Sequence, residues 1–337
     1  MSTLVLDLGG TWIRSALYHD DYSLSKVNKY KLSWTKDNLN SNQKLEIIFS
    51  YLKKISQQYN EEDSINKISI SAGMCINHLN GNVHYSAPLF GDERVNFNFK
   101  ETLINKVFNK PLIVINDVSA LCYGLDALGL RRNYSQFAVL TISSGIALRR
   151  YDVINKKIFF DPVFGIQGEI GHIPILNPFF KYDNKPICAC GGESHFAAYS
   201  SGKGLDNIFD NYLIKDKLFF DTPLGHAYSQ KKISVLALKD ILLSSPDQVD
   251  DLLNIIVYPI AQAIAMLFSF CPEVECLFIC GGLIEALNIF LIKKIFDLLP
   301  KIAYVYDRIF FAERIIFIEK DISLGLIGAG YFASITN

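Results

Sequence analysis

The chain has 337 residues, half of them hydrophobic, and this length exceeds what one hydrophobic core usually accommodates, so we expect two compact domains. Its formal net charge of −1 excludes the basic excess that is typical of proteins that bind nucleic acid. The longest apolar run, residues 255–270, is interrupted by Pro259 and Gln262 and falls short of the roughly 20 residues that cross a bilayer, so we expect no membrane partner.

The first residues predict a strand, a tight turn and a second strand. An apolar run breaks at Asp7, and the turn that follows contains Gly9, Gly10 and Thr11. Glycines without a Cβ let backbone N–H groups approach an anion, the threonine adds a hydroxyl donor, and the aspartate can hold the hydrated Mg²⁺ that accompanies a nucleotide phosphate. The alternative is a hairpin turn with a chance aspartate.

The N-terminus and the cysteines indicate a cytoplasmic protein. The place of an apolar signal core is occupied by Asp7 and two glycines, and no basic segment precedes them. The seven cysteines are an odd number and do not suggest a disulfide framework. Those in apolar sequence are expected to be buried and reduced: Cys75, Cys122, Cys271, Cys276 and Cys280.

Strand and helix patterns alternate along the rest of the chain. Residues 41–58 carry apolar side chains at helical spacing, and residues 68–72 and 112–115 are short β-branched runs. Further helices are expected at 118–128, 236–244, 249–270, 287–299 and 324–333, and further strands at 137–141, 151–160, 276–280 and 315–318. Two successive strand-then-helix blocks, each opening with hairpins, indicate two similar α/β domains that face one another.

The strand at residues 112–115 ends in two polar residues, Asn116 and Asp117. At the carboxyl end of a parallel strand such side chains face the ligand crevice. Asp117 can therefore accept the proton of a substrate hydroxyl that attacks a phosphoryl group, and Asn116 can hydrogen-bond a neighbouring hydroxyl. An Asx helix cap explains the same two residues equally well.

Cysteine and histidine gather with metal-ligand spacing in one region of the chain. Two histidines flank a C-x-C pair: His172, Cys188, Cys190 and His195. Two nitrogen and two sulfur ligands predict a tetrahedral zinc site, and its role is structural because no position is left for water. The zinc would hold the loop so that Glu169 and His172 point into a cleft. The alternative is two buried thiols and two unrelated histidines.

Taken together, these motifs resemble the ROK family of bacterial sugar kinases and sugar-responsive repressors, within the actin-like ATPase and hexokinase superfamily. The resemblance runs over nearly the whole chain. It implies an α/β fold of two actin-like ATPase (ribonuclease H-like) domains facing a cleft. Residues 1–118 with about 318–337 would form the N-terminal domain. Residues 119–317 would form the C-terminal domain, with the zinc loop and the dimerisation surface of a homodimer.

The resemblance also assigns roles to residues. Those assigned to the nucleotide and its phosphates are Asp7, Gly9, Gly10, Thr11, Ser143, Ser144, Gly145, Gly281 and Gly282. Asp7 lies on the magnesium side, and Asn116 and Asp117 match the catalytic pair that also contacts the sugar. Residues 168–172 match the family's G-E-x-G-H motif, whose Glu169 and His172 bind the sugar and whose histidine also ligates zinc.

Several positions depart from the family pattern. His195 replaces a third zinc cysteine, and Ala197 stands where the family usually has a sugar-binding glutamate. The second phosphate loop has Ser143 and Ala147 in place of glycines, and their Cβ atoms crowd an approach that glycine leaves open. We therefore expect weak ATP binding.

The sequence thus predicts an ATP-dependent kinase that phosphorylates a hydroxyl of a hexose or hexosamine, with Asp117 as the general base, Mg-ATP as co-substrate and a structural zinc. The alternative is a non-catalytic sugar sensor of the same fold that acts through a protein partner. The family's repressors carry a helix-turn-helix domain before the kinase-like part. Here the phosphate loop begins at residue 7, so we expect no such domain.

Overall fold

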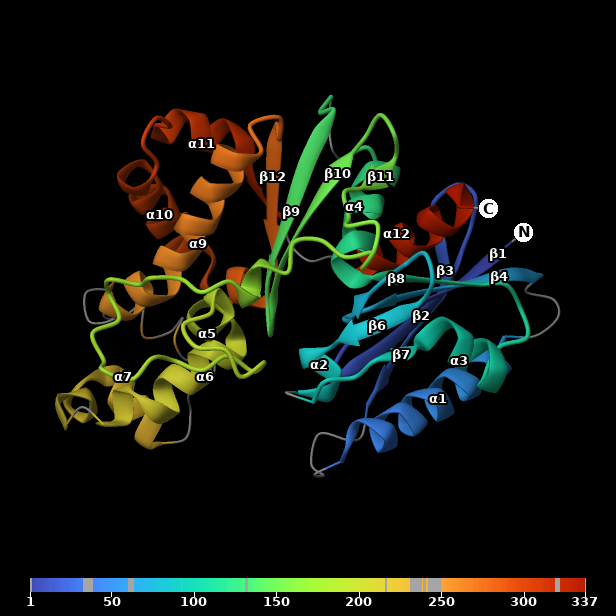
Figure 1. The fold of residues 1–337 in the computed structure, drawn as a ribbon, viewed down its shortest axis with the longest axis horizontal. Coiled ribbons are helices and arrows are strands. Elements are labelled where there is room, and N and C mark those ends of the chain that lie inside the picture. Colours follow the sequence, from blue (N-terminus) through green and yellow to red (C-terminus); the bar gives the residue numbers. More distant parts are fainter. Residues whose placement is uncertain are drawn as a thin grey trace. The chain divides into compact units, whose positions relative to one another are not determined.

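The computed structural model of the chain consists of two compact units, each built from strands and helices (Figure 1). The first unit comprises Met1–Ser135, Arg149–Gln167 and Asp321–Asn337, and the second comprises Gln136–Leu148 and Gly168–Lys320. The residues that the structure describes are 2–32, 39–59, 64–91, 93–130, 133–215, 217–230, 238, 241, 250–318 and 322–336.

The first sheet has the strand order β3-β2-β1-β4-β8. Its strands are β1 (Ser2–Leu8), β2 (Trp12–Tyr18), β3 (Leu24–Lys31), β4 (Ile65–Ala72) and β8 (Leu112–Asn116). The first three form antiparallel hairpins, whereas β1, β4 and β8 run parallel. Because parallel strands end at the same edge, the C-termini of β1, β4 and β8 lie together, and ligand-binding side chains are expected there.

The second sheet repeats this arrangement with the order β11-β10-β9-β12-β13. Its strands are β9 (Gln136–Ile142), β10 (Ile146–Asp152), β11 (Lys157–Ile158), β12 (Cys276–Cys280) and β13 (Ile315–Phe317). Strand β12 lies parallel to both β9 and β13, while β11 pairs antiparallel with β10. The two sheets therefore share one topology.

Helix α1 (Ser41–Gln57) covers one face of the first sheet. It begins at Asn40, whose side chain forms a capping box with Gln43. Its apolar side chains share a buried cluster with Leu4 and Leu6 of β1. These strand residues alternate with side chains that point to the opposite face, as the period of two requires.

Two helices meet on the opposite face, α4 (Asp117–Ala127) and α12 (Ile322–Ile335). Their backbones approach so closely that a Cβ at Gly328 would lie 1.7 Å from the carbonyl oxygen of Ala120. A Cβ at Gly124 would likewise lie 2.3 Å from a backbone oxygen of α12. Only glycine permits this packing, which ties the end of the chain to α4.

A small three-stranded sheet completes the first unit. Its order is β5-β6-β7, with β5 (Cys75–Ile76), β6 (Asn82–Tyr85) and β7 (Phe97–Asn98). Two short helices accompany it, α2 (Ala87–Phe90) and α3 (Phe99–Lys106).

The second unit buries its core between the second sheet and its helices. Within its described residues, the α-helices and 3₁₀ turns are η2 (Ile170–His172), α5 (Phe196–Ser200), α6 (Gly202–Asn211), η3 (Leu213–Lys215), η4 (Lys217–Asp221), α7 (Pro223–Ser229), α9 (Asp250–Phe270), α10 (Gly282–Ile302) and α11 (Arg308–Arg314). Helix α9 is long and apolar enough to cross a membrane, but 72% of its most apolar window is buried inside the structure. This burial is typical of a core helix.

The division into units differs from the predicted boundary at residues 118 and 119. Helix α4 belongs to the first unit because it packs against α12, and so does the segment Arg149–Gln167. Within that segment the buried Tyr151 hydroxyl donates to the carboxylate of Asp126 on α4, at 3.0 Å.

Most predicted elements lie where they were expected, with three differences. The strand predicted at 151–160 is the end of β10, a turn and the short β11. Helix α10 starts five residues before the predicted 287 and is kinked at Asn288, where φ is 34°. Of the predicted helix at 236–244, only residues 238 and 241 lie within the described part of the chain.

Candidate active site and metal centre

Asp7 lies near the end of β1 with both carboxylate oxygens engaged. The guanidinium of Arg14 on β2 donates to Oδ2 at 2.6 Å, and the hydroxyl of Ser71 on β4 donates to Oδ1 at 3.1 Å. The side chains of Asp7 and Arg14 are only 15% and 19% exposed, so water screens this ion pair weakly.

The first glycine turn (residues 9–11) connects β1 to β2. The N–H of Gly9 donates to the carbonyl of Trp12 at 3.0 Å and closes the turn. A Cβ at Gly10 would lie 2.5 Å from the carbonyl oxygen of Pro88, so this position requires glycine. Thr11 is exposed at the tip of this turn.

Asn116 and Asp117 lie at the junction of β8 and α4. Asn116 is the N-cap of α4, and its Oδ1 accepts from the N–H groups of Val118 and Ser119 at 3.0 and 3.1 Å. The predicted helix cap is therefore present. Asp117 Oδ1 accepts from the N–H of Val118 at 3.0 Å, and its position in the first turn of α4 favours negative charge there.

The catalytic candidate and the first glycine turn share one edge of the first sheet. Leu8 pairs with Ala72, which in turn pairs with Asn116, so the three parallel strands end side by side. Gly73 follows directly, and its N–H donates to the carbonyl of Leu8 at 3.1 Å. A Cβ at Gly73 would contact Asp117 Oδ2 at 3.7 Å.

In the second unit, the serine turn (residues 143–145) connects β9 to β10 and meets the start of two helices. The N–H of Gly202, at the beginning of α6, donates to the carbonyl of Ser143 at 2.8 Å. Gly281, which precedes α10, has φ +122°, and a Cβ there would lie 2.3 Å from the carbonyl oxygen of Ile142. Three segments that are distant in sequence therefore meet in this unit: the serine turn, the start of α6 and the start of α10.

Ser143 and Ala147 are both half-buried. The Ser143 hydroxyl lies 4.0 Å from where a Cβ at Gly282 would stand, close to the start of α10. Ser144 is exposed, and Gly145 has no atom within 4 Å of a Cβ position. The turn thus carries a hydroxyl at Ser143, where the family pattern has a glycine.

The loop at residues 168–172 is held against the start of β10. The N–H of Leu148 donates to the carbonyl of Gly168 at 2.8 Å, and a Cβ at Gly171 would lie 2.4 Å from the carbonyl oxygen of Ile146. Glu169 and His172 stand at the two ends of the short 3₁₀ turn η2, joined by a backbone hydrogen bond of 3.1 Å.

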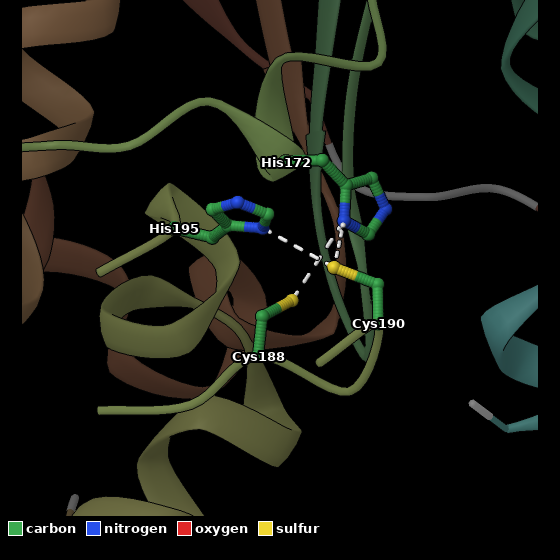
Figure 2. Close-up of side chains that lie close together, drawn as sticks. All are labelled: His172, Cys188, Cys190 and His195. Carbon is green, nitrogen blue, oxygen red and sulfur yellow. Dashed lines mark hydrogen bonds between the residues drawn. The ribbon is translucent and has the colours of Figure 1, made fainter. Parts of the chain in front are cut away.

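The predicted metal ligands come together around one point (Figure 2). His172 Nδ1 lies 3.2 Å from Sγ of Cys190 and 3.7 Å from Sγ of Cys188, and His195 Nδ1 lies 3.2 Å from Sγ of Cys190. All four ligand atoms lie within 4.8 Å of one another. Ligands of a tetrahedral zinc stand about 3.3–3.8 Å apart, so the cluster has suitable dimensions.

The backbone of the loop at residues 188–195 brings these side chains together. Gly191 adopts φ +85°, and its N–H donates to the carbonyl of Cys188 at 2.8 Å. A Cβ at Gly192 would lie 2.0 Å from Cε1 of His195, so only glycine leaves room for that ring. His195 then begins α5, which leads into α6, so the loop connects the metal cluster to the serine turn.

The donor set fits a divalent zinc ion. Burial raises the pKa of the Cys188 thiol to about 11, so a cation is needed to keep this sulfur as a thiolate. Burial, helped by the nearby His172, lowers the pKa of His195 and favours the neutral form that ligates metals. With four protein ligands, such an ion would stabilise the loop and would leave no position for substrate.

Arg14 and Ser71 were not identified as partners of Asp7 from the sequence. In an antiparallel hairpin, residues equally distant from the turn face each other, and Asp7 pairs with Arg14 in this register. The spacing of these two residues about the first glycine turn was therefore an available signal. The Ser71 contact depends on the parallel register of β1 and β4, which is not encoded locally.

Comparison with known proteins identifies the family. The profile of the ROK family matches residues 3–334. A 2-epi-5-epi-valiolone 7-kinase from Actinoplanes sp. is 28% identical over 229 residues, 66% of this chain and 62% of the kinase. A xylose repressor from Bacillus spizizenii is 31% identical over 105 residues, 31% of this chain and 25% of the repressor. The chain thus matches less than two thirds of either relative.

A solved structure confirms the predicted fold class. A ROK family glucokinase from Streptomyces griseus, crystallised with glucose and AMPPNP, superposes with a TM-score of 0.71. The superposition covers 98% of this chain and 99% of the glucokinase at 17% sequence identity. The structural likeness establishes the fold, and the profile match establishes the family.

Proposed function

Because the chain belongs to the ROK family, we propose that it is an ATP-dependent kinase that phosphorylates a hydroxyl of a hexose or hexosamine. The observation that carries the proposal is the position of Asp117. Its carboxylate stands at the start of α4, on the sheet edge that also carries the first glycine turn and Asp7. A base and an anion-binding turn at one edge suit phosphoryl transfer to an alcohol.

In this proposal Asp117 is the general base. It accepts the proton of the substrate hydroxyl as that oxygen attacks the γ-phosphorus of ATP, and ADP leaves. Positioning and charge neutralisation supply most of the remaining rate enhancement, since the transferred group needs little covalent assistance.

Nucleotide-binding roles are proposed for segments of each unit, each considered by itself. Backbone N–H groups and the hydroxyl of the first glycine turn are proposed to bind phosphate oxygens, and Asp7 to hold Mg²⁺ through its water shell. An outer-shell contact suits Asp7 because Arg14 and Ser71 already donate to its two oxygens. The serine turn is proposed as the second phosphate site, and Gly281 and Gly282 as the backbone that borders adenosine.

Glu169 and His172 are proposed to bind sugar hydroxyls, and zinc to orient them. His172 turns Nδ1 toward the metal cluster, so the Nε2 side of its ring points away from it (Figure 2). A ligated histidine offers its second nitrogen as a donor in a fixed tautomer. A structural zinc would therefore act on sugar binding through the orientation of η2.

The names of the relatives indicate only a broad class of substrate. The glucokinase structure holds glucose, and the valiolone kinase is named for a polyhydroxylated carbocycle. We propose a six-membered polyol of this kind, a cytoplasmic location and a homodimer. Ala197 is buried and stands where the family usually has a sugar-binding glutamate, so one side chain that could hydrogen-bond the sugar is missing. We therefore expect a substrate whose hydroxyl pattern differs from that of glucose.

A sugar sensor without catalytic activity is the second candidate, because a xylose repressor is among the similar proteins. The altered serine turn favours the sensor, because a weakened phosphate site reduces affinity for ATP. The intact Asp7, Asp117 and first glycine turn favour the kinase, because a sensor needs neither a base nor a magnesium-side carboxylate.

The discriminating experiment is coupled detection of ADP release over a panel of neutral, amino and N-acetylated hexoses and a carbocyclic polyol. A kinase produces ADP with at least one of them. Sugar binding by calorimetry with no Mg-ATP binding and no ADP release would instead support the sensor.

A further inference from the structure

We propose that the metal cluster controls the affinity for Mg-ATP, and that α5 and Ser201 connect the cluster to the serine turn. The inference rests on the proposed function, because it treats the serine turn as a phosphate site. It goes beyond the effect of the metal on sugar binding. All the residues that carry it belong to the second unit.

The backbone joins the metal ligands to α5. His195 is both a candidate ligand and the N-cap of α5, and its side chain makes no capping hydrogen bond. The segment that follows His172 pairs with this point. The N–H of Phe196 donates to the carbonyl of Ile173 at 2.9 Å, and Pro174 forms a β-bridge with His195. A metal that holds both histidines therefore fixes the start of α5.

Helix α5 is short and is packed on all sides. Each of its five side chains is buried, from Phe196 to Ser200. The Ser200 hydroxyl donates to the carbonyl of Ile256 on α9 at 2.6 Å and so holds the far end of the helix. In a close-packed interior such a helix moves as one body. We therefore expect loss of the metal to turn α5 about Ser200 rather than to release it.

Ser201 connects α5 to α6. Its buried hydroxyl donates to the carbonyl of Ala197 on α5 at 2.6 Å and accepts from the N–H of Gly204 on α6 at 3.0 Å. A Cβ at Gly204 would lie 2.3 Å from the same carbonyl oxygen, so the two backbones are in close contact. A rotation of α5 therefore moves the start of α6.

The start of α6 in turn holds the serine turn. The N–H of Gly202 donates to the carbonyl of Ser143 at 2.8 Å, and the N–H of Ser143 donates to the carbonyl of Gly145 at 2.9 Å. Both backbone polar groups of Ser143 are thus fixed. If α6 moves, the donors that the turn offers to a phosphate move with it, and a site that is less preorganised binds its ligand more weakly.

Removal of the metal tests the proposal directly. In Cys188→Ser with Cys190→Ser, the dissociation constant of Mg-ATP, measured by calorimetry without sugar, should rise about fivefold, the lower end of the usual coupling between sites. Cys271→Ser is the control, because this cysteine lies outside the cluster, and it should match the wild type. An unchanged dissociation constant in the metal-free double variant would overturn the inference.

Ser201→Ala tests the connection while the metal is still bound. The zinc content should stay that of the wild type, and Mg-ATP binding should weaken about threefold, because α6 loses its N-cap beside the serine turn. Thr222→Ala is the matched control. The Thr222 hydroxyl caps α7 with the same two hydrogen bonds, to the carbonyl of Phe219 at 2.6 Å and from the N–H of Gly225 at 3.0 Å. Equal Mg-ATP affinities of the two variants would contradict a role of Ser201.

Combining the variants shows whether the metal acts through Ser201. If it does, loss of both cysteines weakens Mg-ATP binding by a smaller factor in the Ser201→Ala background than in the wild type, because the connection is already broken. Equal factors in the two backgrounds would mean that the metal and Ser201 act independently, and this part of the proposal would be wrong.

Amide hydrogen exchange gives a readout that does not depend on ATP. Exchange at Gly202, whose N–H is bonded to the Ser143 carbonyl, should be faster in the metal-free double variant than in the wild type. Exchange at Gly225, which Thr222 caps, should not change. Unchanged exchange at Gly202 would contradict the inference. A wild-type chain that binds no Mg-ATP would overturn the proposed kinase function, whereas the exchange at Gly202 would still decide whether the metal controls the serine turn.

Discussion

The guanidinium of Arg14 lies 2.6 Å from the carboxylate of Asp7, across the hairpin whose turn is the first glycine turn. This pair places a positive charge beside the carboxylate on the magnesium side. It also engages an oxygen of Asp7 that a directly bound cation would need.

The Arg14–Asp7 pair should stabilise the first unit measurably. A double-mutant cycle with Arg14→Gln and Asp7→Asn, followed by urea unfolding, should give a coupling free energy above about 1 kcal/mol, because the pair is largely withdrawn from water. The pair Lys106–Glu46 is the matched control. Its atoms also lie 2.6 Å apart, but its side chains are 52% and 65% exposed. There the coupling should stay below about 1 kcal/mol. Equal couplings would show that burial is not decisive.

Asp117→Asn should abolish most turnover and leave the fold intact. The amide keeps the shape and can still accept from the N–H of Val118, but it is not a base. A general base contributes about 10²–10⁴-fold in rate, so kcat with the best sugar should fall within that range. Thermal melting and sugar calorimetry should resemble the wild type. Near-normal turnover would mean that another group takes the proton.

The purified chain should contain about one zinc ion, which elemental analysis can measure. Cys188→Ser together with Cys190→Ser removes both sulfur ligands and should abolish the metal. Sugar binding should be lost with it, because the metal is proposed to hold His172 at the end of η2 and so to orient Glu169. Cys271→Ser is the control, since that half-buried cysteine lies outside the cluster. Full metal content in the double variant would refute the site.

His78 should make the first unit sensitive to acid. Its ring packs edge-on against Phe160 and Phe332, at centroid distances of 4.6 and 5.7 Å, and burial lowers its pKa. The folded state therefore binds a proton less readily than the unfolded chain, whose histidine titrates near pH 6.5. Stability conferred by the neutral ring is complete above that pH and is lost as the pH falls below it. His78→Phe should flatten the dependence of the urea midpoint between about pH 6.5 and 5. An unchanged slope would exclude His78 as its cause.

The local parts of the site were predictable from sequence, because each depends on residues close together in the chain. The C-x-C pair with its flanking histidines, and the polar residues after β8, are of this kind. The hydrogen bonds of Asn116 were not, because its amide reaches the carbonyl of Met74, forty-two residues away. Sequence spacing left the helix cap and the sugar contact equally supported.

The membership of α4 in the first unit could not be predicted locally for a related reason. Helix α4 follows a strand of the first sheet, yet its placement depends on glycine contacts with α12 near the end of the chain. No local sequence pattern at residues 118–128 indicates that α4 packs against α12. The serine turn shows the same limit, since its contact with Gly202 joins segments about sixty residues apart.

ATP affinity should improve when the serine turn is restored to glycine. Ser143→Gly with Ala147→Gly removes two half-buried Cβ atoms and one hydroxyl next to the start of α10. The backbone hydrogen bond from Gly202 to the carbonyl of residue 143 does not depend on the side chain. The KM for ATP should therefore fall while the KM for sugar stays nearly constant, as expected for a change in nucleotide binding alone.

Ser144→Gly provides the control for that variant. Ser144 is exposed, so its replacement adds backbone freedom at one position of the same turn without opening the buried side of the turn. If ATP affinity rises equally with Ser144→Gly, flexibility and not crowding is the cause. If the wild type already binds Mg-ATP tightly and the double glycine variant weakens it, the serine hydroxyls are ligands of the phosphates. The departure from glycine would then be an adaptation of the phosphate site rather than damage to it, and the case for a sensor would lose its main support.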